Sequence, residues 1–181
     1  MKPIVLAGVL AFALVGCKPA PQASTAPSPA LVATAPASPE PLLVGVFAGD
    51  LPCADCPGMA TRLTLVRKDH GWAEGRYLMV QSYRERDVAP LVRTGDWTTL
   101  RGDAEDPDAV VYQLDPEKES GGELFRKEGE QTVRALTPAQ RPFPAGLPQT
   151  LARQTTDLPT DAAVSCLRGG GTPKDGDVCS R

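Results

Sequence analysis

The sequence predicts an all-β domain that follows an export signal and a proline-rich tether. From residue 42 onward, short apolar or alternating runs recur at close spacing, and Gly-, Asp- and Pro-containing turns separate them. Alternation of apolar and polar residues is typical of half-buried strands, and no stretch has a convincing helical period. This pattern favours an antiparallel sandwich or a small β-barrel, and closure into a barrel would remove exposed strand edges.

Residues 1–16 have the pattern of a bacterial lipoprotein signal peptide. Lys2 supplies a positive charge, and the apolar run 4–15 is shorter than the ~20 residues that span a bilayer. The run ends in Leu-Val-Gly-Cys17, which resembles the lipobox. The resemblance implies cleavage before Cys17, lipid on its sulfur and, because Lys rather than Asp follows, a place in the outer membrane. The alternative is an ordinary signal peptide in which Cys17 is a free thiol.

Residues 17–42 contain the lipidated Cys and a linker. Prolines alternate there with Ala, Ser and Thr, at positions 19, 21, 27, 29, 36, 39 and 41. Such a segment has too little apolar content to fold, so we expect an extended, disordered tether. At ~3.1 Å per residue it could hold a domain several tens of Å from the membrane.

The strands of the domain are expected over residues 43–153. In the second strand, Leu63 and Leu65 face one side while Arg62 and Thr64 face the other, and a turn at 68–71 makes a hairpin with the third strand. The expected strands are 42–49, 61–67, 72–82, 91–98, 110–114, 123–127, 132–136 and 149–153.

Residues 51–58 concentrate the chemistry of the chain. The sequence Leu-Pro-Cys53-Ala-Asp55-Cys56-Pro-Gly places two thiols three residues apart in a Pro-flanked turn. Such a pair can close a disulfide, hold a soft metal ion or exchange with other thiols. Catalytic exchange requires the first Cys at a helix N-terminus, but a strand pattern follows here, and the charge of Asp55 disfavours a thiolate.

Metal binding and a structural disulfide stay open as alternatives for this turn. Two thiolates are soft ligands for Cu(I), and Met59, Met79 or His70 could add a further ligand if the fold brings one near. For the two Met residues the plainer interpretation is core packing, and for His70 a solvated turn. The plainer interpretation of Cys53 and Cys56 is a disulfide that staples the turn.

Residues 154–181 form a polar, Gly-rich tail in which Cys166 and Cys179 are expected to close a disulfide loop. The alternative is a four-thiolate metal site that joins them to Cys53 and Cys56. Because lipid would occupy Cys17, an even number of four Cys is left of the five, as an oxidising envelope requires.

Composition and missing motifs argue against two classes of function. The net charge is −3 and Lys and Arg are scattered, so no basic stripe points to nucleic acid. The chain has one His and neither a G-x-S-x-G elbow nor a zinc-spaced His pair, so we expect no enzyme and no required cofactor.

These residues together carry a family resemblance. A first strand is followed by Gly49-Asp-Leu-Pro-Cys-Ala-Asp-Cys-Pro-Gly-Met59, by the alternating Leu63 and Leu65, and then by Tyr83 and Gly95-Asp-Trp97. This order resembles the N-terminal domain of the NlpE copper-resistance lipoproteins. The resemblance implies a lipocalin-like antiparallel β-barrel, outer-membrane anchoring toward the periplasm, and a link to copper tolerance and envelope-stress signalling. Family members of the better-known type carry a second β-domain, where this chain has only the 154–181 tail.

Two functional hypotheses follow. In the first, a non-enzymatic outer-membrane lipoprotein senses envelope stress and supports copper tolerance, because Cys53 and Cys56 bind Cu(I) or change thiol state and so alter the surface offered to a periplasmic or inner-membrane signalling protein. In the second, the barrel is a binding module for a small apolar ligand or an inhibitor of an envelope enzyme, and the two Cys form only a structural disulfide.

Overall fold

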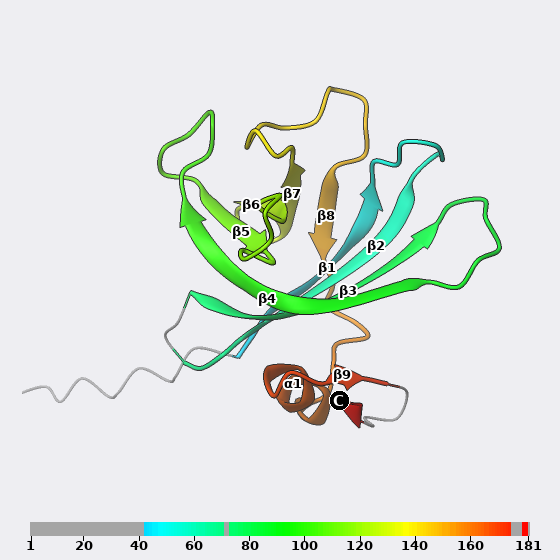
Figure 1. The fold of residues 1–181 in the computed structure, drawn as a ribbon, viewed down its shortest axis with the longest axis vertical. Coiled ribbons are helices and arrows are strands. Elements are labelled where there is room, and N and C mark those ends of the chain that lie inside the picture. Colours follow the sequence, from blue (N-terminus) through cyan, green and yellow to red (C-terminus); the bar gives the residue numbers. More distant parts are fainter. Residues whose placement is uncertain (1–41, 71–72, 175–178, 181) are drawn as a thin grey trace, which may run out of the picture. The chain divides into compact units, whose positions relative to one another are not determined.

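Eight antiparallel strands close into a barrel in the computed structural model, which describes residues 42–70, 73–174 and 179–180 (Figure 1). Each strand pairs with the next in sequence, and β8 pairs with β1 to complete the barrel. The prediction of an all-β antiparallel barrel is therefore confirmed. The strands are β1 (Leu43–Leu51), β2 (Met59–Arg67), β3 (Glu74–Tyr83), β4 (Leu91–Arg101), β5 (Val110–Leu114), β6 (Glu123–Glu128), β7 (Thr132–Leu136) and β8 (Thr150–Arg153).

The barrel interior is filled by every second side chain of the strands, as a period of two requires. Leu63 and Leu65 are fully buried there, so the predicted inward face of β2 is correct. The opposite face of β2 is also covered, because Thr64 is 6% exposed and Val66 is 0% exposed. The interior core consists of Phe47, Leu51, Leu63, Leu65, Tyr77, Met79, Trp97, Tyr112, Leu114, Phe125, Val133, Ala135 and Leu151.

Trp97 of β4 forms hydrogen bonds to β2 and β3 inside the barrel. Its indole Nε1–H donates to the carbonyl of Val66 at 3.0 Å and to that of Arg76 at 3.1 Å, while its ring packs edge-on against Tyr112. Gly75 lies opposite Trp97, and a Cβ at Gly75 would lie 1.9 Å from the Val66 carbonyl oxygen. Part of the motif that carried the family resemblance therefore serves the packing of the barrel.

The tail differs from the expected polar loop, because it contains a short helix, α1 (Asp161–Arg168). Thr160 caps the helix by accepting a hydrogen bond from the N–H of Ala163. Val164 and Leu167 pack against Val66 on the outer face of β2, which explains the burial of that face. A two-stranded sheet of β9 (Thr172–Pro173) and β10 (Cys179–Ser180) completes the tail.

Several sequence predictions lie outside the described residues. These are the signal peptide, the lipid attachment at Cys17, nearly all of the proline-rich tether and the start of the third strand at Trp72. Within the described part of the chain, α1 has eight residues, and no helix has both the length and the apolar character to cross a membrane.

Candidate functional site

The Cys53–Cys56 turn connects β1 to β2 at one end of the barrel. Strand pairing continues up to Leu51 and Met59, so the intervening residues project as a loop beyond the last paired residues. Cys53 and Cys56 form a disulfide with a Cα–Cα distance of 5.3 Å. Both Cys are only partly buried, and Ala54 and Asp55 between them are exposed. The disulfide is therefore within reach of a reductant or a protein partner.

Two arginines from the segment after β3 hold this turn. Arg84 donates through Nη2 to Asp50 Oδ1 at 2.7 Å, and its backbone N–H donates to the Gly58 carbonyl at 3.0 Å. Arg86 donates to the backbone carbonyl of Asp55 at 2.8 Å and to its carboxylate at 3.0 Å. Each such exposed ion pair contributes little by itself. Together with the backbone bond, the two pairs add contacts to the turn that do not involve the disulfide.

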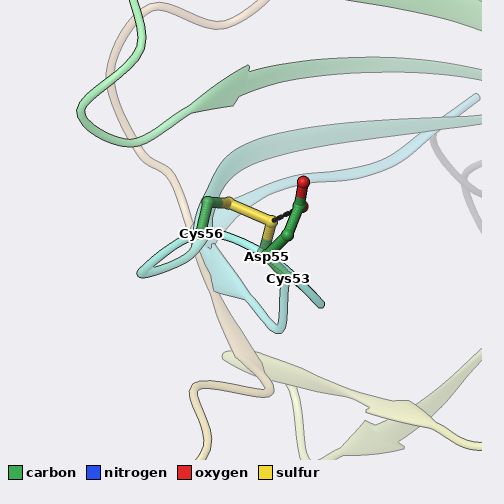
Figure 2. Close-up of side chains that lie close together, drawn as sticks. All are labelled: Cys53, Asp55 and Cys56. Carbon is green, nitrogen blue, oxygen red and sulfur yellow. Dashed lines mark hydrogen bonds between the residues drawn. A yellow bond between two sulfur atoms is a disulfide. The ribbon is translucent and has the colours of Figure 1, made fainter.

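Asp55 lies beside the disulfide (Figure 2). Its Oδ1 is 3.5 Å from Cys53 Sγ, and because a disulfide sulfur carries no proton, this is a contact rather than a hydrogen bond. The hydrogen bond from Arg86, followed by the charge of Arg86, holds the pKa of Asp55 below its usual range. The carboxylate therefore stays ionised next to the sulfur, and in the reduced protein it would raise the pKa of the Cys53 thiol.

We expect Asp55→Asn to make the reduced protein more reactive. Asp55→Asn removes the negative charge beside Cys53 and leaves the positive charge of Arg86, still bonded to the backbone carbonyl of residue 55, without its counter-ion. Both changes stabilise the thiolate, so alkylation by iodoacetamide near neutral pH should accelerate roughly fivefold. The rate is measured by mass spectrometry after reduction. Asp50→Asn is the matched control, because Asp50 also pairs with an arginine but belongs to β1, outside the Cys53–Cys56 turn. An unchanged or slower rate in Asp55→Asn would contradict this electrostatic argument.

Of the other predicted ligands, Met79 and His70 lie away from the turn, whereas Met59 directly follows it. Met79 is 0% exposed in the barrel core, with its sulfur 3.0 Å from Arg93 Nη2. His70 follows the far end of β2, which has nine residues and is therefore about 30 Å long. Met59 is the first residue of β2, directly after the turn, and it is partly buried. The clustered ligand atoms are those of Cys53, Asp55 and Cys56, which lie within 4.8 Å of one another.

The tail cysteines form a disulfide of their own. Cys166 in α1 is bonded to Cys179 in β10, with a Cα–Cα distance of 5.6 Å. Its helix packs at Val66, near the end of β2 that lies opposite the Cys53–Cys56 turn. The structure thus holds the four thiols in two separate pairs and does not bring them together as a four-thiolate site.

Arg84 and Arg86 are the residues that sequence reasoning missed. They follow β3, whereas the carboxylates they bind belong to β1 and to the β1–β2 turn. The segment Arg84-Glu85-Arg86-Asp87 alternates in charge, which is an ordinary feature of solvated turns. Only the register of β2 with β3, in which Met59 lies opposite Tyr83, brings the arginines to the turn.

More than half of the chain matches a known protein family. The sequence matches the NlpE N-terminal domain family over residues 47–145. The chain belongs to the NlpE family. This match confirms the resemblance drawn from the sequence, and the matched region of this NlpE-family chain contains the Cys53–Cys56 turn and the Gly95-Asp-Trp97 motif.

Two solved bacterial structures are similar to this NlpE-family chain. A Shewanella oneidensis protein described as a lipoprotein has 20% sequence identity and a TM-score of 0.43, with 62% of this chain and 89% of that one covered. The Cpx pathway activator NlpE of Escherichia coli has 21% identity and a TM-score of 0.37, with 65% and 52% covered. This chain thus aligns with about half of the E. coli protein. No curated protein sequence matches the chain at a significant level.

Proposed function

We propose that this chain is an envelope-stress lipoprotein, held in the outer membrane by lipid on Cys17, in which the Cys53–Cys56 turn responds to copper or to thiol state. Membership of the NlpE family supports the stress role, since a solved member is described as a Cpx pathway activator. The observation that carries the proposal is a partly exposed disulfide on a turn that Arg84 and Arg86 also hold through contacts without sulfur. In this proposal the turn presents its changed surface to a periplasmic or inner-membrane signalling protein.

The turn is suited to a change of state because the disulfide and the arginine contacts are separate. Arg84 and Arg86 tie Asp50, Asp55 and Gly58 through hydrogen bonds that involve no sulfur. Reduction would therefore release Cys53 and Cys56 while the ends of β1 and β2 stay paired. The reductant in that step is an external dithiol, which gives two electrons and two protons and is itself oxidised to a disulfide. The Cys53–Cys56 S–S bond breaks, and each of its two sulfurs gains a proton.

The donor atoms of the reduced turn fit Cu(I). Cys53 and Cys56 would supply two soft thiolate sulfurs from one short turn, and their deprotonation is the requirement for binding. The carboxylate of Asp55 is a hard oxygen ligand and adds little affinity for a soft ion. Met59, three residues after Cys56, is the next soft donor along the chain. Cu(I) bound by Cys53 and Cys56 would stabilise the reduced form of the turn against oxidation.

Thiol trapping in living cells tests the proposal. Cells are quenched in acid with and without added copper, free thiols are alkylated, and the peptides of Cys53, Cys56, Cys166 and Cys179 are mapped by mass. We expect the trapped fraction of Cys53 and Cys56 to change with copper, whereas Cys166 and Cys179 stay oxidised and serve as the internal control. A Cys53–Cys56 disulfide that is complete under every condition would mean that the turn is only a staple. The mass of the N-terminal peptide reports the lipid on Cys17.

A further inference from the structure

A cavity of about 270 Å³ opens at the end of the barrel that carries the Cys53–Cys56 turn. Its size is near the lower end of small-molecule sites, roughly 300–1,000 Å³. An apolar cavity of about 150 Å³ accommodates a benzene ring, so this one can accept a chain of about eight carbons. Its apolar walls come from Leu51, Pro52 and Met59 on one side and from Phe125, Ala135 and Phe143 on the other.

The apolar walls are fixed before any ligand binds. Leu51 and Met59 are paired strand residues, and Phe125 and Ala135 face each other across β6 and β7. Phe143 belongs to the β7–β8 connection, where the side chain of Gln149 accepts from its backbone N–H at 3.0 Å and donates to its carbonyl at 3.4 Å. A preformed cavity of this kind lowers the entropy cost of binding.

One polar group in the cavity wall is left with capacity to accept a hydrogen bond. Glu123 accepts from Arg93 Nη2 through Oε1 at 2.6 Å, while within the described part of the chain no donor reaches Oε2. Gln81, the other polar wall residue, is hydrogen-bonded at both amide atoms: its nitrogen donates to Thr61 and its oxygen accepts from Arg93. A ligand would therefore meet mostly apolar walls and the carboxylate of Glu123, whose side chain is 42% exposed.

We propose that this cavity binds a small amphiphile with an alkyl or similar apolar body and one hydrogen-bond-donating headgroup, such as an alcohol, which donates to Glu123 Oε2. A carboxylate headgroup is disfavoured, because it would place a like charge against Glu123. An ether is disfavoured as well, because it has no donor for Oε2. Neither Cys53 nor Cys56 lines this cavity, so ligand binding does not require the proposed thiol chemistry, although Met59 belongs to its wall.

Two isomeric probes, 1-octanol and 1-methoxyheptane, test the proposal. They contain the same atoms and differ in whether the oxygen carries a proton. The lipidated full chain is placed in lipid nanodiscs, and hydrogen–deuterium exchange is followed by mass spectrometry as each probe is titrated. We expect 1-octanol to slow exchange around residues 51–59, 123–125 and 135–143, at a concentration roughly tenfold lower than 1-methoxyheptane needs, because a hydrogen bond to a carboxylate discriminates by that factor.

Two variants make the result decisive. In Glu123→Gln the amide oxygen can still accept from Arg93, and an NH2 donor replaces the second carboxylate oxygen. The preference for 1-octanol should therefore vanish or reverse. In Ala135→Leu the added side chain fills the cavity, so neither probe should protect these segments. Amide hydrogen exchange in the paired residues of β1 and β8, away from the cavity, reports whether either variant is still folded. Equal protection by both probes, no protection at all, or an unchanged preference in Glu123→Gln would overturn the proposal, whatever thiol trapping shows.

Discussion

Replacing Cys53 and Cys56 together by Ser is expected to abolish the copper response of cells while leaving the barrel folded. Growth of a deletion strain in copper should be rescued by the wild-type chain and not by the double variant. The loss of stability should be small, because the disulfide closes a separation of three residues, for which the chain-entropy estimate is about 2 kcal/mol at most. Paired strands and two arginine contacts continue to hold the turn.

The Cys166→Ser and Cys179→Ser pair is the matched control for this experiment. This disulfide spans a separation of 13 residues, so its loss should cost more, about 3 kcal/mol, and should loosen α1 from the barrel. We expect this control to keep the copper response, since the barrel and the Cys53–Cys56 turn remain. Urea unfolding gives the two stabilities. Full rescue by Cys53→Ser with Cys56→Ser would favour the binding-module hypothesis, in which the disulfide is only structural.

Replacing Trp97 by Ala is expected to have the largest effect on stability, about 3–5 kcal/mol. The indole is 2% exposed, so its removal leaves a cavity in the interior core. It also leaves the carbonyls of Val66 and Arg76 without the indole donor that they share. The shift of the urea midpoint measures the loss, and the barrel signal in circular dichroism shows whether a folded state remains.

Trp97→Phe separates the two contributions. The Phe ring keeps part of the packing against Tyr112 but cannot donate, so an intermediate loss is expected, with about 1 kcal/mol from the lost indole hydrogen bond. Gly75→Ala tests the same contact from the opposite strand, because its Cβ would overlap the Val66 carbonyl oxygen. A Trp97→Ala variant within about 1 kcal/mol of wild type would contradict this role for the indole.

The strands could be predicted because their information is local. Alternation of apolar and polar residues locates β5 and β7 at the residues where the structure has them, and the turns between strands are marked by Gly, Asp and Pro. Helix α1 could not be predicted in this way. Eight residues are too few to form a stable helix alone, and α1 depends on burial of Val164 and Leu167 against Val66, which is about 100 residues away.

Part of the candidate site could be predicted from the sequence, and part depends on strand pairing. Its two thiols, the adjacent Asp55 and the Pro-Gly turn are all contained in one short stretch of sequence, so the family and the chemistry of the turn follow from it. Arg84 and Arg86 reach the turn only through the pairing of β2 with β3, and the cavity exists only where the β1–β2 end meets β6 and β7. His70 and Met79 were candidates as ligands until the same register placed them elsewhere.

The sequence by itself determined the strand pattern, the NlpE resemblance and the thiol pair, because each depends on residues that are neighbours along the chain. The tertiary structure alone decided which charges hold the turn, which face of β2 is covered, and where Glu123 meets an apolar cavity. These features join residues far apart in sequence, and a one-residue change of register would have turned each strand's side chains to the other face of the barrel.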